Sequence, residues 1–344
     1  PRAPHYATTE NRELTKRLLA AAKAKVKRAG KPTAKVRVKG PAFECADLPD
    51  NAYSDGETAD RAVEVLGQLK GQPFFLAVGF YKPHLAFVAP KKYWDLYDRA
   101  ALRMAGNPSL PEGCPPIAAT DWSELRHYQG IPKEGALPDD LALTLIHGYL
   151  ACVSFTDAQI GRVLAELKRL GLEENTIVVL WGDHGWKLGE HGMWCKHTNF
   201  ELDCRAPLLC ATPGQKAPGA RTSALVELVD IYPTLCDLAG IAKPPHLEGL
   251  SFAPLLDEPA RSWKTAAFSQ FPRRDAMGYS IRTDHYRYTE WRGPGGDVLA
   301  KELYDHRSDP GENRNIAASV TPGEIGPIAA ALKAGWRGAL PQDR

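Results

Sequence analysis

The sequence has no paired cysteine motif, no long apolar run and almost no net charge. Its seven cysteines are scattered and odd in number, which excludes a disulfide scaffold and favours free thiols, with one bridge left open. No apolar run approaches the roughly 18 residues of a membrane helix, so no transmembrane segment is predicted. With 43 Lys and Arg against 41 Asp and Glu, the net charge of +2 argues against a general nucleic-acid binder.

What is present is the composition of a globular protein with a sizeable core. Of the 344 residues, 44% are hydrophobic and 24% are charged, which excludes wholesale disorder. This length corresponds to one large domain, or to one large and one small domain. Because the first residue is Pro1 rather than Met, we expect a fragment or a processed product, in which no signal peptide could be seen.

Residues 1–261 alternate between helical and strand patterns. Apolar faces at helical spacing predict helices, and short continuous apolar runs are typical of strands buried on both faces of a parallel sheet. The proline-rich residues 87–138 are expected to run irregularly over the surface. The basic helix 12–31 is most simply a solvated surface helix, and contact with an anionic partner or a membrane surface is the alternative. The predicted helices are 12–31, 139–170 and 230–239, and the predicted strands are 73–79, 176–181 and 207–211.

The pattern changes after residue 262. Tyr286 and Tyr288 alternate with Arg287 and Thr289, which is the period of two of a β-strand. Residues 278–283 precede this strand, and a closing helix is predicted over residues 322–336. The sequence therefore predicts an α/β domain over residues 1–261 and a small antiparallel subdomain over residues 262–344.

Two groups of polar residues follow predicted strands, where open α/β sheets bind their ligands. Asp183 and His184 come just after strand 176–181. His84 comes just after strand 73–79, in a loop because Pro83 favours an extended conformation for the preceding Lys82. Both groups are candidate functional sites.

Residues 183–197 concentrate Asp, Glu, three His, three Gly and two Lys. A glycine-rich turn capped by Asp183 is the structural alternative to a functional site. A zinc site of His184, His191, His197 and Cys195 lacks the usual ligand spacing. A hard-cation site at Asp183 needs further carboxylates, and no Asp pair stands at another strand end. No G-x-S-x-G motif provides a nucleophile.

Five ordered motifs resemble the sulfatase family, and the resemblance covers about residues 42–317. The likeness to the iduronate-2-sulfatase-like group depends on residues 82–84, 185–196 and 277–289. The five motifs are residues 74–84, 148–162, 182–200, 225–235 and 302–313.

The resemblance implies an alkaline-phosphatase-like fold, in which helices enclose a mostly parallel sheet and a small antiparallel α+β subdomain follows. It implies hydrolysis of a sulfate ester by a formylglycine nucleophile with one Ca²⁺ ion. Asp183 and His184 match metal ligands, although His184 is also suited to contact the nucleophile or the sulfate. Lys196 matches the lysine that contacts the sulfate. His84 matches a histidine that hydrogen-bonds the sulfate and protonates the leaving group.

Trp186, His191 and Arg282 are expected nearby, as pocket wall or supporting residues. The family's C/S-x-P-x-R motif is absent from the sequence, and no Asp-Asp pair follows a predicted strand where the family's metal pair would stand. The resemblance then implies that ligands outside this chain complete the Ca²⁺ site. A missing N-terminal segment or a separate chain would supply the formylglycine, and this chain alone would be inactive.

The family implies a sulfated carbohydrate substrate, such as a glycosaminoglycan, and a periplasmic or secreted protein. Two alternatives stay open. One is a phosphoester or phosphonate hydrolase of the same superfamily. The other is a non-catalytic remnant that binds sulfated glycans.

Overall fold

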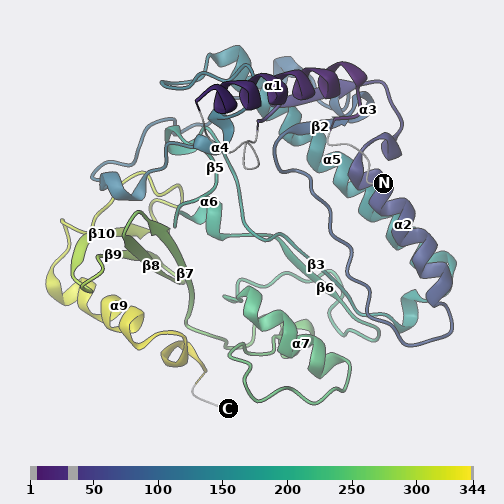
Figure 1. Ribbon diagram of the computed structural model, residues 1–344. Coiled ribbons are helices and arrows are strands. Elements are labelled where there is room, and N and C mark those ends of the chain that lie inside the picture. The colour runs from purple at the N-terminus through teal and green to yellow at the C-terminus, as the bar shows by residue number, and fades with distance from the viewer. Residues whose placement is uncertain (1–5, 30–37, 342–344) are drawn as a thin grey trace. The chain divides into compact units, whose positions relative to one another are not determined.

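The computed structural model describes residues 6–29 and 38–341 (Figure 1). The chain divides into two compact units. Unit 1 comprises residues 1–106 and 122–173, and unit 2 comprises residues 107–121 and 174–344. Each unit is built from segments that are not contiguous in the sequence. The predicted domain boundary at residues 261–262 stays a prediction.

Unit 1 is built around the long helix α5 (Asp139–Arg169). This helix packs on α2 (Ser54–Leu69) and on β2 (Phe87–Pro90), which pairs in parallel with β1 (Phe43–Ala46). By length and composition α5 could span a membrane, but it packs like the core helix of a globular unit, with Leu145 and Phe155 fully buried. The remaining helices of unit 1 are α1 (Thr9–Arg28), α3 (Lys91–Trp94) and α4 (Ser123–Arg126).

Unit 2 contains a four-stranded antiparallel sheet in the order β10-β9-β8-β7. Helix α9 (Pro322–Ala334) packs Ile328 and Leu332 against Ile281 and Tyr288 of this sheet. A second antiparallel pair, β3 and β6, packs with α7 and α8 around Ile231. The short strands β4 and β5 pair with each other as a hairpin, which lies between β3 and β6 along the chain. The bounds are β3 (Val178–Trp181), β4 (Lys187–Leu188), β5 (Trp194–Cys195), α6 (Glu201–Cys204), β6 (Leu208–Ala211), α7 (Ile231–Leu238), α8 (Ala253–Asp257), β7 (Ala266–Arg273), β8 (Ala276–Thr283), β9 (Tyr286–Arg292) and β10 (Val298–Asp305).

Most predicted elements are confirmed. Helices α1, α5, α7 and α9 and strands β3 and β6 lie where the sequence periodicity indicates, although residues 30–31 of the first predicted helix fall outside the described residues. The antiparallel unit after residue 262 is confirmed by the register of β7 to β10. The seven cysteines are free thiols, so the single disulfide that the sequence allowed is not formed.

The predicted strand 73–79 is wrong. Residues 73–80 carry no strand assignment, although exposed and half-buried residues alternate along them with the period of two of a strand. No strand among the described residues pairs with them, so the backbone pattern lacks the ladder that would make it a sheet. Strand β2 was not predicted, because its four buried residues are the first residues of the proline-rich segment 87–138. That segment was expected to run irregularly over the surface.

Candidate functional site

Asp183 and His184 follow β3 directly, as the sequence predicts. The side chain of Asp183 is 86% exposed, and its Oδ2 lies 3.6 Å from Nε2 of His184. Nδ1 of His184 lies 2.8 Å from the carbonyl oxygen of Gly185. A Cβ atom at Gly185 would lie 1.9 Å from the carbonyl oxygen of Leu202, so only glycine fits there. This contact fixes the backbone immediately after the two polar side chains.

Trp186 joins these residues to Lys196. Its ring stacks on the His184 ring, with centroids 6.0 Å apart and an interplanar angle of 26°. The Lys196 ammonium lies 4.7 Å from the centroid of the same indole ring, within cation–π range. Three of the residues picked out from the sequence, together with the expected neighbour Trp186, are therefore brought together in unit 2.

The backbone around Lys196 is strained. Cys195 and His197, on either side of it, have φ angles of 68° and 86°. Residues with a side chain adopt this left-handed region at a cost, and such residues cluster at functional sites. Nη2 of Arg273 donates to the carbonyl oxygen of His197 at 2.6 Å and so holds one of the two strained residues.

A buried ion pair closes the segment that carries Asp183, His184 and Lys196, which we call the lysine loop (residues 183–203). Nζ of Lys187 lies 2.6 Å from Oδ1 of Asp203 and donates to Thr198 Oγ1 at 2.7 Å. The other carboxylate oxygen of Asp203 accepts the backbone N–H of Thr198 at 2.8 Å. Both charged side chains are almost fully buried, and burial lowers the pKa of Lys187. The pair links the two ends of the loop.

His84 lies in unit 1, in a segment that we call the histidine loop (residues 81–86). Nζ of the buried Lys82 donates to the carbonyl oxygens of His84 at 2.9 Å and Ala86 at 2.6 Å. The Asp55 carboxylate accepts the backbone N–H groups of Tyr81 at 3.0 Å and Lys82 at 2.8 Å. Burial lowers the pKa of Lys82 to about 8, so its ammonium form persists at neutral pH.

Both ring nitrogens of His84 face oxygen atoms. Nδ1 lies 2.7 Å from the carbonyl oxygen of Leu85, and Nε2 lies 2.9 Å from Oε1 of Glu124. Only the doubly protonated imidazolium can donate to both oxygens at once. The His84 side chain is 24% exposed, so it is reachable from solvent. The ring of His84 is thus held between the Leu85 carbonyl and Glu124 while it stays accessible.

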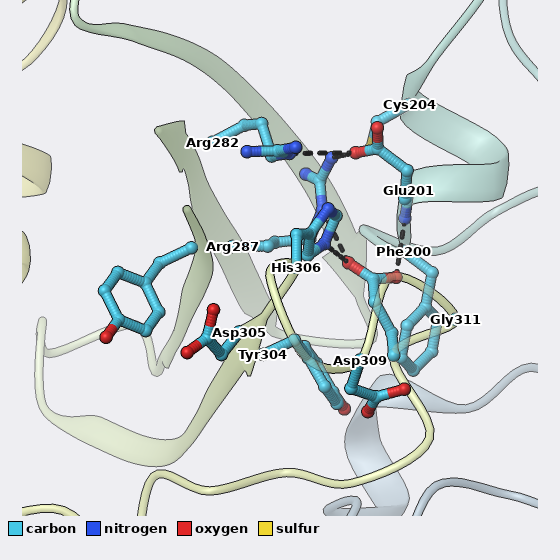
Figure 2. A network of polar contacts seen from close by, with 12 residues as sticks. Phe200, Glu201, Cys204, Arg282, Arg287, Tyr304, Asp305, His306, Asp309 and Gly311 are labelled. Atoms are coloured by element: carbon cyan, nitrogen blue, oxygen red, sulfur yellow. Dashed lines mark hydrogen bonds and ion pairs between the residues drawn. The ribbon is translucent and has the colours of Figure 1, made fainter. Parts of the chain in front are cut away.

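A charged cluster in unit 2 was missed by sequence reasoning (Figure 2). Arg287 binds the Glu201 carboxylate, and its Nε lies 2.9 Å from Glu312 Oε1 as an ion pair. Nε2 of His306 lies 2.9 Å from the same Glu312 oxygen. Although burial opposes it, the Arg287 guanidinium lowers the pKa of Glu201.

The ligand atoms of Glu201, His306 and Glu312 lie close enough together to hold a metal ion. The guanidinium of Arg287, however, already lies within hydrogen-bond distance of both carboxylates, and Arg282 places a second positive charge beside Glu201. A cation would have to displace it, so the cluster is better explained as an ion-pair network that ties α6 to β9 and to the loop after β10.

Two of the expected neighbours belong to this structural framework. Arg282 Nε lies 3.3 Å from Glu201 Oε2. His191 is buried, and its Nε2 lies 2.8 Å from the carbonyl oxygen of Gly311.

Comparison with known proteins decides the family. Residues 7–241 match the family model described as Sulfatase, and residues 189–333 match the one described as N-sulphoglucosamine sulphohydrolase, C-terminal. The chain belongs to the sulfatase family. It is 34% identical over 349 residues to iduronate 2-sulfatase of Mus musculus, covering 79% of this chain and 63% of that protein. The human iduronate 2-sulfatase is 32% identical, with 81% and 64% covered.

This sulfatase chain thus spans just under two thirds of the length of those two relatives. Among solved structures, a protein in complex with its substrate D-glucosamine-2-N,6-O-disulfate has a TM-score of 0.71 at 23% identity, covering 83% of this chain and 70% of that one. A phosphonate monoester hydrolase from Silicibacter pomeroyi has a TM-score of 0.70 at 25% identity, covering 90% and 62%. The predicted alkaline-phosphatase-like α/β fold with a small antiparallel subdomain is confirmed.

Sulfatase membership implies a Ca²⁺ ion, and the residues present can be tested for it. Hard cations such as Ca²⁺ prefer about six to eight oxygen ligands. The exposed Asp183 carboxylate fits as one contributor. His184 fits less well, because its available atom is a nitrogen, and it suits contact with a sulfate oxygen better. The Asp183 carboxylate is therefore compatible with one position in a Ca²⁺ site, and its role as a metal ligand stays a prediction.

Proposed function

We propose that this chain contributes to the active site of a sulfatase that hydrolyses a sulfate ester on a sulfated sugar. A 2-O-sulfated uronic acid of a glycosaminoglycan is the substrate class, by analogy with the iduronate 2-sulfatases. The observation that carries the proposal is the grouping of Asp183, His184 and Lys196 around Trp186, in a chain of the sulfatase family. Location in the periplasm or outside the cell is part of the same proposal.

In this proposal Lys196 binds the sulfate. Its ammonium is a fixed positive charge that stabilises the negative charge developing on the sulfate oxygens during hydrolysis. The strained backbone at Cys195 and His197 restricts where Lys196 can point. When its ring is doubly protonated, His184 can donate from Nε2 to a sulfate oxygen while Nδ1 donates to the Gly185 carbonyl oxygen.

Asp183 would be a ligand of the Ca²⁺ ion, which supplies a positive charge that polarises the sulfate. The 344 residues contain no C/S-x-P-x-R motif, so the formylglycine nucleophile would come from polypeptide that carries one. His84 is the proposed proton donor to the leaving sugar oxygen, because its ring is reachable from solvent and its Nε2 faces the Glu124 carboxylate. The buried Lys82 keeps the histidine loop in place for that transfer.

Hydrolysis of a phosphonate or phosphate ester is the second candidate. The likeness to the phosphonate monoester hydrolase favours it, because that enzyme shares the fold over 90% of this chain. Both ester classes present anionic oxygens to a lysine and a metal, so the same side chains would serve.

The test is a comparison of substrates on the natively expressed protein, with mass spectrometry to identify every polypeptide in the preparation. Release of sulfate from a 2-O-sulfated iduronate disaccharide is expected, at a higher kcat/KM than for a phosphonate monoester. The reverse preference would establish the second candidate. Binding of the disaccharide without release of either product would leave the glycan-binding alternative.

A further inference from the structure

A cationic cavity lies beside the histidine loop within unit 1. Its volume is about 460 Å³, which is within the range of roughly 300–1,000 Å³ for small-molecule sites. The charged residues in its wall are all basic, and they are joined by three tyrosines. The lining residues used below are Tyr6, Arg12, Lys16, Lys39, Tyr81 and Tyr128.

The wall of this cavity is anchored. The buried Glu44 carboxylate accepts hydrogen bonds from the Ala7 N–H at 2.8 Å, the Thr8 hydroxyl at 2.6 Å and the Asn11 amide at 2.8 Å. These bonds hold the start of α1 in unit 1. Arg12 follows one residue after this anchored start, so its cation is presented from a held helix end rather than from a loose one.

The other lining residues are also held by contacts within unit 1. Lys39 donates to the Tyr128 hydroxyl at 3.2 Å and lies 4.6 Å from the centroid of that ring. The Tyr6 hydroxyl donates to the carbonyl oxygen of Pro41 at 2.7 Å. A Cβ atom at Gly40 would lie 2.7 Å from that hydroxyl, so the backbone itself comes close there. Lys39, Tyr6 and Tyr128 are therefore held in place before any ligand binds.

Tyr81 connects the cavity to the histidine loop. It lines the cavity, and its ring centroid lies 4.9 Å from that of His84. A chain of sugars whose sulfate ester reached His84 would therefore place a neighbouring sugar near Tyr81. Tyrosines combine a broad apolar face with a hydroxyl, which suits a sugar ring, and arginine binds carboxylate or sulfate oxygens with two parallel hydrogen bonds.

We propose that this cavity is a subsite for an anionic sugar next to the one that is desulfated. Arg12 and Lys39 would bind its sulfate or carboxylate group, with Lys16 in support, and the tyrosines would contact the ring. Lys16 also pairs with Glu13 at 2.6 Å, so it is the least available of the three cations. The inference rests on the proposed function, because it takes the substrate to be a sulfated oligosaccharide.

The experiment is calorimetric titration of the full chain with a heparin-derived tetrasaccharide at about 0.1 M salt, where long-range attraction is largely screened. The variant is Arg12→Gln with Lys39→Gln. The matched control is Lys25→Gln with Lys27→Gln, which removes the same charge from exposed positions further along α1. We expect the cavity variant to bind at least about tenfold more weakly, the factor for losing one charge-assisted hydrogen bond, and the control to change by less than about twofold.

Equal weakening by the two variants would overturn the subsite in favour of general attraction to a basic helix. So would equal binding of a neutral tetrasaccharide, or no binding to the unmodified chain. Tetrasaccharides that carry only carboxylates or only sulfates would identify the anion. If the cavity variant unfolds, Arg12→Lys with Lys39→Arg keeps both charges and should restore binding. The titration measures binding and not hydrolysis. A preparation that fails to release sulfate would therefore contradict the proposed function, while the subsite would still be tested by the titration.

Discussion

The histidine loop and the lysine loop are each held by a buried lysine, but the partners of the two lysines differ. Lys82 donates to two backbone carbonyl oxygens, at 2.9 and 2.6 Å. Lys187 is paired with the Asp203 carboxylate at 2.6 Å. Lys82 holds the histidine loop through separate hydrogen bonds to neutral carbonyl groups, and these bonds can be lost one at a time. In a buried ion pair, each charge depends on the other for its compensation.

The difference teaches which substitutions each loop tolerates. In the lysine loop, removal of one partner leaves a buried charge without its counterion. In the histidine loop, removal of Lys82 leaves two carbonyl groups without a donor and takes a positive charge away from the buried Asp55, whose carboxylate keeps its backbone N–H partners. Loss of a counterion costs more than loss of a neutral hydrogen bond.

The largest effect is expected from Asp203→Ala. It strands the Lys187 ammonium in a buried position and should lower the free energy of unfolding by about 3–5 kcal/mol, as seen in denaturant titration. The control is Lys187→Met combined with Asp203→Leu, which removes both charges and should recover much of the loss. A single variant no less stable than the double variant would show that the ion pair does not hold the loop.

Glu302 extends the comparison to a buried carboxyl group whose hydrogen-bond donors are neutral side chains. Trp291 Nε1 and the Tyr304 hydroxyl each donate to it at 2.8 Å, and burial raises its pKa to about 7 from 4.5. A raised carboxyl pKa means that the folded state holds the proton more tightly. The protonated Glu302 side chain therefore contributes its full stabilisation of the folded state below pH 4.5. This contribution is lost as the pH rises to about 7.

Glu302→Gln should therefore remove a decline of ~3 kcal/mol in unfolding free energy between pH 4.5 and 7. Urea titrations across that range would measure it. Glu290→Gln is the comparison variant, since Glu290 is paired with Arg292 at 2.6 Å and its loss should destabilise the sheet instead. An unchanged slope in Glu302→Gln would contradict the assignment.

A smaller effect is expected from Lys82→Met. It leaves the carbonyl oxygens of His84 and Ala86 without their ammonium donor and should cost ~1–3 kcal/mol. In the natively expressed protein we also expect a lower kcat. Lys82→Arg should recover part of the stability if a cation at this position is what matters. A loss as large as that of Asp203→Ala would mean that the two loops are not held differently.

The smallest effect on stability is expected from Lys196→Met, because methionine keeps a flexible apolar side chain against the indole of Trp186, on which the Lys196 ammonium lies. We predict a change within about 0.5 kcal/mol in unfolding free energy, measured by thermal denaturation. A large loss of stability would instead assign Lys196 a structural role.

The sequence predicted the helices well because their apolar spacing is local, as in α5 and α7. It also located Asp183 and His184, because they follow a recognisable strand. It failed at residues 73–79, where the strand pattern is present but no described strand pairs with it. It could not find the network around Glu201, whose partners Arg287 and Glu312 are 86 and 111 residues away. Pairings of that kind are set by tertiary packing and leave no local pattern.

The most direct test of the central claim is sulfate release from a 2-O-sulfated iduronate disaccharide by the natively expressed protein and its Lys196→Met variant. Lys301→Met, an exposed lysine in the same unit, is the matched control. The account predicts sulfate release by the unmodified protein and the control, and a kcat lower by about 100-fold to 1,000-fold in Lys196→Met, the usual effect of losing a charge-stabilising group. Equal sulfate release with and without Lys196 would contradict it.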